Sequence, residues 1–216
     1  MNAATARRDG RAARWDAHRA GRREELVDAA LAAVREHGPT VAMDDVARVA
    51  GTSKTVVYRY FADKSALYLA VCERITGTLV ARLQAVLDEA GAEAEPGRRL
   101  LARAVDTYLA FVEDDPQVYR FVVSPPATER PEDGDPVADL TALVGDRAGA
   151  VLARSLPGTD DAEGLLWGHG LVGLVRAAGD HWVATGARTP REELTRSLTD
   201  LAWGGLSHRV RERSTR

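Results

Sequence analysis

Apolar side chains recur at three- and four-residue steps through most of the chain, which is the spacing of one face of an α-helix. The first such run includes Leu26, Ala30 and Val34, and it ends at His37 where Gly38-Pro39 interrupts the pattern. A glycine followed by a proline is typical of the end of a helix. We therefore predict a first amphipathic helix over residues 18–37.

Two short helical patterns follow and meet at a tight corner. Met43, Val46, Ala47 and Ala50 give one apolar face, and Gly51 ends that run. Two turns of helix are too short to be stable alone in water, so this helix must pack on its neighbours. Ser53 precedes the next run and is placed to accept a hydrogen bond from the free amides that open a helix. The two runs predict a helix-turn-helix.

The third helix has two different faces. Val56, Val57 and Phe61 can point inward, whereas the remaining side chains carry hydroxyl, phenol and amine groups that are free to point outward. A helix of this size fits the major groove of DNA, where its first turn reaches base edges and its flanks reach phosphates. The outward residues are Lys54, Thr55, Tyr58 and Tyr60.

The fourth run keeps one apolar face from Asp63 to Glu89, which is longer than a small domain requires, so we expect it to connect the DNA-binding domain to the rest of the chain.

No convincing strand is present. We predict an all-α protein of about nine helices, with an N-terminal three-helix helix-turn-helix DNA-binding domain and a larger helical ligand-binding and dimerisation domain. The expected divisions are a disordered basic arm (1–20), the DNA-binding domain (21–66), the ligand-binding and dimerisation domain (67–210) and a tail (211–216). The later helices are expected over 98–112, 117–123, 137–156, 160–185 and 191–208.

Residues 22–69 resemble the N-terminal domain of the tetracycline-repressor (TetR) family. The likeness runs through His37-Gly38, Met43-Asp44-Asp45-Val46-Ala47, Ala50-Gly51-Thr52-Ser53-Lys54, Val57-Tyr58-Arg59-Tyr60-Phe61 and Asp63-Lys64-Ser65-Ala66-Leu67. It implies that Thr52, Lys54, Thr55, Tyr58 and Tyr60 contact DNA, with Ser53 at the same surface, and that Lys64 pairs with a phosphate. Asp63 is a good N-cap, so the helix dipole and the Lys64 ammonium favour the same anion.

Two positions depart from the family pattern. Ala42 stands where the family usually has Ser or Thr, so a helix cap and a phosphate contact are missing unless Thr40 supplies them. Thr55 stands where many members have Gly, and it adds a hydroxyl and a methyl that can contact bases. The target sequence therefore cannot be copied from relatives.

The formal net charge of −3 is unevenly distributed: residues 1–62 hold 11 Lys and Arg against 8 Asp and Glu, and residues 63–216 hold 18 against 24. The basic end is the one suited to phosphate. Seven Arg lie in the first 23 residues, which we interpret either as a solvated arm or as an arm that follows the phosphate backbone. The single cysteine, Cys72, excludes an internal disulfide, and no signal peptide or membrane-spanning run is evident. We expect a cytoplasmic protein.

The last two helices have larger apolar faces, including Trp167, Trp182 and Trp203, than one thin helical layer can cover. The TetR resemblance implies that helices 160–185 and 191–208 form a homodimer with their copies, which places two recognition helices against a palindromic double-stranded DNA operator. The alternative is that these Trp residues are intramolecular core. Several glycines within 160–185 indicate either close helix packing or room for a ligand.

A small hydrophobic effector is expected among the helices at 98–112, 117–123, 137–156 and 160–185. Gly170-Leu171-Val172-Gly173-Leu174 and Leu201-Ala202-Trp203-Gly204-Gly205-Leu206-Ser207-His208 resemble actinobacterial TetR regulators of lipid metabolism, which implies long-chain acyl-CoA or a fatty acid. The alternative is a regulator of drug efflux or catabolism that binds an aromatic or other apolar molecule. The candidate lining residues are Phe111, Tyr119, Phe121, Leu140, Val144, Trp167, Leu171, Val175 and Arg176, with Arg120 as a second possible anion partner.

Other classes of protein fit the sequence less well. His18, His37, His169, His181 and His208 do not have the spacing of metal ligands, and no glycine-rich phosphate loop follows a strand. We predict no enzyme activity, no metal and no cofactor. A helical adaptor that does not bind DNA is disfavoured by the polar, basic recognition helix. The expected activity is that of a repressor in which effector and operator alter each other's affinity.

Overall fold

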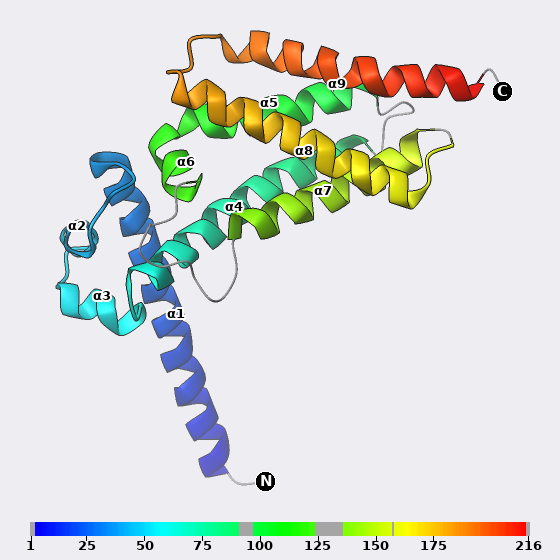
Figure 1. Cartoon of the computed structure of the whole chain (residues 1–216). Helices are drawn as coiled ribbons and strands as arrows, with labels where there is room; N and C mark the ends of the chain where they lie inside the picture. The colour runs from blue at the N-terminus through cyan, green and yellow to red at the C-terminus, as the bar shows by residue number, and fades with distance from the viewer. Residues whose placement is uncertain (1–2, 91–96, 124–135, 157, 215–216) are drawn as a thin grey trace. The chain divides into compact units, whose positions relative to one another are not determined.

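The computed structural model describes residues 3–90, 97–123, 136–156 and 158–214, and these residues form helices and connecting turns without a strand. This agrees with the predicted all-α class. The described ranges contain nine helices, which Figure 1 labels. They are α1 (Ala3–His37), α2 (Met43–Val49), α3 (Lys54–Tyr60), α4 (Lys64–Ala90), α5 (Arg98–Asp114), α6 (Pro116–Val123), α7 (Pro136–Ser155), α8 (Asp161–Ala184) and α9 (Arg191–Ser214).

The first and last helices are longer than the sequence pattern predicted. α1 begins at Ala3, so residues 3–20, which we expected to be a disordered arm, are helical. Ala and Arg are strong helix formers and no proline interrupts the segment, so the helix continues beyond its apolar face. α9 likewise continues to Ser214, into the segment expected to be a tail.

The chain divides into two compact units, and within the described residues it crosses between them inside α4 and inside α6. The described part of the first unit runs to Arg74 and also includes Arg120–Val123. The second unit covers Ile75–Tyr119 and resumes, within the described residues, at Pro136. The expected boundary at residues 66 and 67 therefore falls inside the first unit. Tyr68 of α4 gives the reason, because its buried hydroxyl donates a hydrogen bond to the Val122 carbonyl, 2.8 Å away.

The core of the first unit is built from the apolar faces of α1, α2, α3 and the start of α4. Gly38 adopts φ 83° and ends α1, as its place after the apolar run predicted. Arg74 of α4 pairs with Asp28 of α1 at 2.8 Å and also contacts Glu24. The side chains with almost no exposure are Leu26, Val27, Ala30, Ala33, Val34, Val46, Val57, Phe61, Val71 and Cys72.

In the second unit α7 packs on α8, and α5 packs on α9 and α8 (Figure 1). Where α7 and α8 approach most closely, backbone lies against backbone. A Cβ added to Gly168 would lie 2.3 Å from the Gly145 carbonyl oxygen and 2.4 Å from the Gly149 nitrogen. One added to Gly164 would lie 2.7 Å from the Gly149 oxygen. These glycines therefore serve close helix packing, one of the two roles that the sequence left open.

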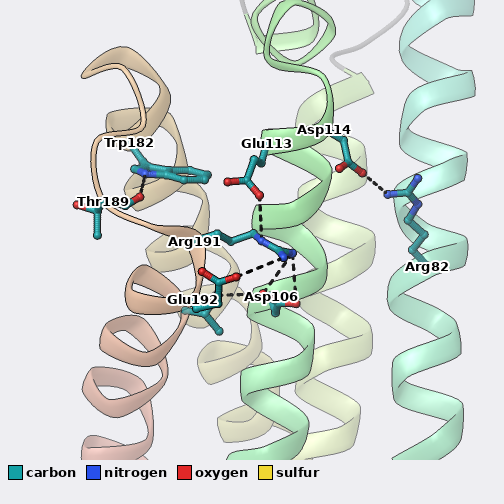
Figure 2. Close-up of polar contacts among 9 residues, drawn as sticks. Arg82, Asp106, Glu113, Asp114, Trp182, Thr189, Arg191 and Glu192 are labelled. Atoms are coloured by element: carbon teal, nitrogen blue, oxygen red, sulfur yellow. Dashed lines mark hydrogen bonds and ion pairs between the residues drawn. The ribbon is translucent and has the colours of Figure 1, made fainter.

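Charged residues fix the start of α9 to α5. Figure 2 shows the Arg191 guanidinium between Asp106 and Glu113 of α5, with nitrogen–oxygen distances of 3.4 and 3.0 Å. The buried Arg191 Nε lacks hydrogen-bond geometry, so its contact with Glu113 is electrostatic. The Trp182 indole of α8 donates a hydrogen bond to the carbonyl of Thr189, in the turn before α9, at 2.8 Å (Figure 2). Trp182 is thus a core residue within one chain.

Candidate nucleic-acid interface

The third helix has one buried face and one exposed polar face. Val57 and Phe61 are fully buried, and the Arg23 guanidinium of α1 lies 5.2 Å from the centre of the Phe61 ring. On the other side, Lys54 and Thr55 are exposed and the Tyr58 side chain is 44% exposed. The buried face fixes the rotation of α3, so its outward residues form a defined surface.

Local hydrogen bonds set the ends of these helices. Ser53 caps α3 by accepting a hydrogen bond from the Val56 amide, and Asp63 caps α4 by accepting one from the Ala66 amide at 2.7 Å. Both caps were predicted from sequence. Gly51 ends α2 in the left-handed region at φ 60°, which favours glycine. These features produce the corner between α2 and α3.

The start of α2 lacks a side chain that caps the helix, and a carboxylate in its first turn binds the backbone instead. Ala42 has no acceptor, and among the described residues Thr40 makes no cap bond and is exposed. Instead the Ala42 amide donates to the Asp45 carboxylate at 3.0 Å, which is half of a capping box. That bond and the Arg48 contact at 3.1 Å lower the pKa of Asp45. Thr40 is thus free to contact another molecule but does not replace the cap.

The predicted DNA-contacting residues lie in the same compact unit on adjacent elements. Tyr60 and Thr52 are half-buried, so Tyr60 is less exposed than the outward position that its sequence pattern predicted. Lys64, in the first turn of α4, is also half-buried. The exposed members of the set are Thr40, Ser53, Lys54, Thr55 and Tyr58.

Sequence reasoning missed the acidic partner of the recognition helix. Lys54 Nζ lies 2.8 Å from Asp44 Oδ2 at the start of α2, and this hydrogen-bonded carboxylate raises the pKa of Lys54. Next to it, Arg48 contacts Asp45, Glu36 and His37. The only available sequence signal was the position of an acid in the first turn of the preceding helix.

The second unit contains a polar cluster within the predicted effector region. The Tyr108 and Tyr119 hydroxyls are 2.8 Å apart, and the Tyr119 hydroxyl donates to Asp180. Arg176 Nε lies 3.9 Å from Asp180 Oδ2, and Arg176 also donates to the Thr141 hydroxyl at 3.3 Å. Four helices, α5, α6, α7 and α8, contribute to this polar cluster. Sequence reasoning had selected Tyr119 and Arg176 but missed Tyr108 and Asp180.

Burial changes the acidity of the two tyrosines in the polar cluster. Burial raises the pKa of Tyr108 to about 12, against a smaller opposing effect of its bond with Tyr119. Burial also raises the pKa of Tyr119, and the hydrogen-bonded Tyr108 and Asp180 raise it further. Both hydroxyls therefore stay protonated at neutral pH and act as hydrogen-bond donors or acceptors.

The other candidate effector residues are distributed over both units. Phe121 belongs to the first unit, where it is buried with its ring centre 5.2 Å from that of Tyr68, and Arg120 in the same unit is exposed. The Leu140 side chain lies outside the described residues. The remaining candidates are half-buried and belong to the second unit, and they are Phe111, Val144, Trp167, Leu171 and Val175.

Comparison with known families identifies the chain. Residues 26–71 match the family described as bacterial regulatory proteins, tetR family, and residues 82–215 match the tetracyclin repressor-like C-terminal domain. The two matches together cover the helix-turn-helix and most of the second unit. The chain belongs to the TetR family.

TetR-family relatives support this assignment along most of the chain. An uncharacterized HTH-type transcriptional regulator of Mycobacterium tuberculosis is 34% identical over 211 residues, which cover 94% of this chain and 85% of the relative. The HTH-type transcriptional activator FasR of Mycolicibacterium smegmatis is 29% identical over 188 residues, covering 87% and 84%. Both are transcriptional regulators, which indicates a DNA-binding rather than an enzymatic role for this TetR-family chain.

A solved structure shares the fold at lower identity. It is the transcriptional regulator FadR of Bacillus subtilis in complex with stearoyl-CoA, which superposes with a TM-score of 0.66 at 15% identity and covers 84% of this chain and 98% of that one.

In the part of the TetR-family chain that the structure describes, no helix is long and apolar enough to span a membrane. The same described residues contain no group of His, Cys, Asp or Glu that could hold a metal ion.

Proposed function

We propose that this TetR-family chain is a repressor that binds a palindromic operator as a homodimer and releases it when a small hydrophobic effector binds. The observation that carries the DNA-binding part is the exposed face of α3, where Lys54, Thr55 and Tyr58 project from a helix fixed by buried Val57 and Phe61. Lys64 adds a cation at the start of the capped helix α4, where the helix dipole also favours an anion. Such a surface suits base edges flanked by phosphates.

An apolar stripe on α8 and α9 supports the homodimer. Leu166 is 74% exposed and Leu201 is 65% exposed, which is unusual for large apolar side chains. Gly170, Gly173 and Ala177 are also exposed and continue from Leu166 at helical spacing along α8. Gly204 and Gly205 extend the α9 side of the stripe. Because glycines allow close backbone approach, a second copy of the same two helices fits this stripe better than a dissimilar partner.

The proposed effector site lies among α5, α6, α7 and α8, around the polar cluster of Tyr108, Tyr119, Thr141, Arg176 and Asp180. Its tyrosine hydroxyls suit the carbonyl or hydroxyl of a mostly apolar molecule, and the half-buried Val144, Trp167, Leu171 and Val175 suit the apolar remainder. A long-chain acyl-CoA is the favoured effector. Its support is the sequence resemblance and a FadR structure of the same fold that holds stearoyl-CoA.

The test begins with an operator duplex enriched from a random-sequence pool by the purified chain. Fluorescence anisotropy then measures operator affinity with stearoyl-CoA, with free coenzyme A and with stearate. Stearoyl-CoA is expected to change the affinity by roughly 5- to 150-fold, the usual range of coupling between two sites. Free coenzyme A should have no effect because it lacks the acyl chain. No response to stearoyl-CoA or stearate would exclude the acyl effector.

A second arm addresses the alternative effector class. Aromatic apolar dyes are titrated into the same complex, and a response to them alone would assign the chain to the regulators of efflux or catabolism. Repeating the measurement at several salt concentrations tests DNA binding itself, since phosphate contacts lose affinity steeply as salt rises. Absence of salt-dependent binding would favour the helical adaptor. A reporter gene behind the operator distinguishes repression from activation.

A further inference from the structure

Two consecutive acids open α2, and they have different partners. Asp45 works within its own helix, where it accepts the Ala42 amide and pairs with Arg48. Asp44 instead reaches across the helix-turn-helix corner to Lys54 on α3, with 2.8 Å between Oδ2 and Nζ. The Asp45 carboxylate is therefore explained by the fold of α2, whereas the Asp44 carboxylate faces the recognition helix.

The Lys54–Asp44 pair contributes little to the stability of the fold. The two side chains are 49% and 67% exposed, and ion pairs at such exposed positions are strongly screened by water and salt. Neither side chain is among the buried residues of the first unit. The pair therefore acts mainly on the charge of the exposed α3 surface.

The pair changes how α3 presents positive charge to DNA. A Lys ammonium has three donors, so a carboxylate can occupy one and leave the others for a base edge. Its net charge is nevertheless cancelled, which reduces its attraction for phosphate. Within the described residues Arg59 and Lys64 have no carboxylate partner, so they keep their full charge. Lys54 thus differs electrostatically from Arg59 and Lys64.

We propose that Asp44 is a specificity-determining residue of the DNA-binding surface: by pairing with Lys54 it weakens the sequence-independent attraction of α3 for phosphate and keeps the ammonium over base edges. This inference rests on the proposed DNA-binding role of α3. Non-specific binding comes almost entirely from phosphate neutralisation, whereas specific binding adds base contacts. Removing the Asp44 charge should therefore strengthen binding to any DNA more than binding to the operator.

The experiment compares Asp44→Asn with the wild-type chain on two probes, a mixed-sequence duplex and the enriched operator. The expected result is several-fold tighter binding to the mixed-sequence duplex, a smaller change on the operator, and a lower ratio of specific to non-specific affinity. The slope of log affinity against log salt should steepen by about 1, because Lys54 gains one phosphate contact. Asp44→Glu retains the carboxylate and should behave like the wild type.

A double-mutant cycle separates pairing with Lys54 from general repulsion between Asp44 and DNA. In a Lys54→Met background, Asp44→Asn should leave non-specific binding and the salt slope nearly unchanged. If the full effect persists in that background, or if Asp44→Asn has no effect in the wild-type background, the inference about Asp44 is wrong although α3 still binds DNA. If Lys54→Met binds both probes like the wild type, the proposed role of α3 is wrong as well, and the inference falls with it. Circular dichroism melting verifies that each variant is folded.

Discussion

Thr55 is exposed at the start of the recognition helix, at a position where many TetR relatives have glycine. Replacing its hydroxyl by a methyl in Thr55→Val keeps the shape of the side chain and leaves the buried face of α3 untouched. We expect discrimination at one base position of the operator to fall by about 1–3 kcal/mol, because a hydrogen bond to a base edge is lost. Binding to a set of operators changed at single positions measures this.

Thr40→Val is the matched control for Thr55→Val. Thr40 is exposed but precedes α2, where its hydroxyl can reach a phosphate and not the bases addressed by α3. Its replacement should weaken binding equally for all operators. If Thr55→Val and Thr40→Val changed the affinity for every operator by the same factor, Thr55 would not contact a base.

The tyrosines of the polar cluster predict a loss of stability at alkaline pH. The pKa of Tyr108 is raised from 10.0 to about 12 in the fold. The folded state therefore holds its proton more tightly than the unfolded state, so the free energy of unfolding falls as pH rises from about 10 towards 12. Tyrosinate absorbance during an alkaline titration should show Tyr108 and Tyr119 ionising above the ordinary pKa of tyrosine, and Tyr119→Phe should remove part of this delayed change. The absence of any delayed ionisation in the folded chain would contradict it.

Residue-scale features were predictable from sequence where both partners are close in the chain. The caps formed by Ser53 and Asp63 each bond to an amide three residues later, so a local pattern is enough to predict them. The contacts of Asp44 with Lys54 and of Tyr119 with Asp180 join different helices and depend on how those helices pack. Sequence alone does not determine such packing, which is why half of each pair was missed.

Glycines differ in role even within one helix. Gly168 of α8 touches the α7 backbone, whereas a Cβ on Gly170 or Gly173 would meet nothing within 4 Å. The composition of α8 indicated either close helix packing or room for a ligand, and it could not assign individual glycines to one role. That division depends on the crossing point of α7 and α8, which is a property of the packed pair.

Gly168→Ala should therefore destabilise the second unit. The added methyl would overlap α7 backbone atoms that cannot move aside as a flexible side chain does. We expect a loss of about 1–3 kcal/mol, which is typical of overpacking, and a lower midpoint in thermal or urea unfolding. Gly77→Ala in the exposed part of α4 is the control, because a Cβ there meets nothing within 4 Å and alanine favours helix. A Gly168 variant as stable as this control would contradict the close contact.

At the scale of the whole molecule, the exposed stripe on α8 and α9 predicts the oligomeric state. Leu166→Glu and Leu201→Glu should each weaken self-association by roughly a hundredfold. Each substitution occurs in both subunits of a two-fold interface, so two unpaired carboxylates would be buried there. Light scattering after size-exclusion chromatography should then report monomers, and operator affinity should fall in parallel. Leu143→Glu is the control, since Leu143 is also exposed but lies on α7 outside the stripe. An unchanged dimer in both α8 and α9 variants would exclude this interface.

The crossings between the two units have a consequence for recombining regulators. Because the chain passes from one unit to the other inside α4 and inside α6, neither unit is a contiguous module. A chimera that joined residues 1–66 of this chain to the remainder of a relative would take Tyr68 and Val122, both part of the first unit, from the donor of the effector domain. A gene fusion should therefore transfer operator specificity only when it includes α4 through Arg74 and the second half of α6 together with the helix-turn-helix. A regulator that receives only the effector domain of a relative would lose first-unit contacts made by α4 and α6. These two helices therefore limit how easily a new effector response can be acquired by exchanging domains.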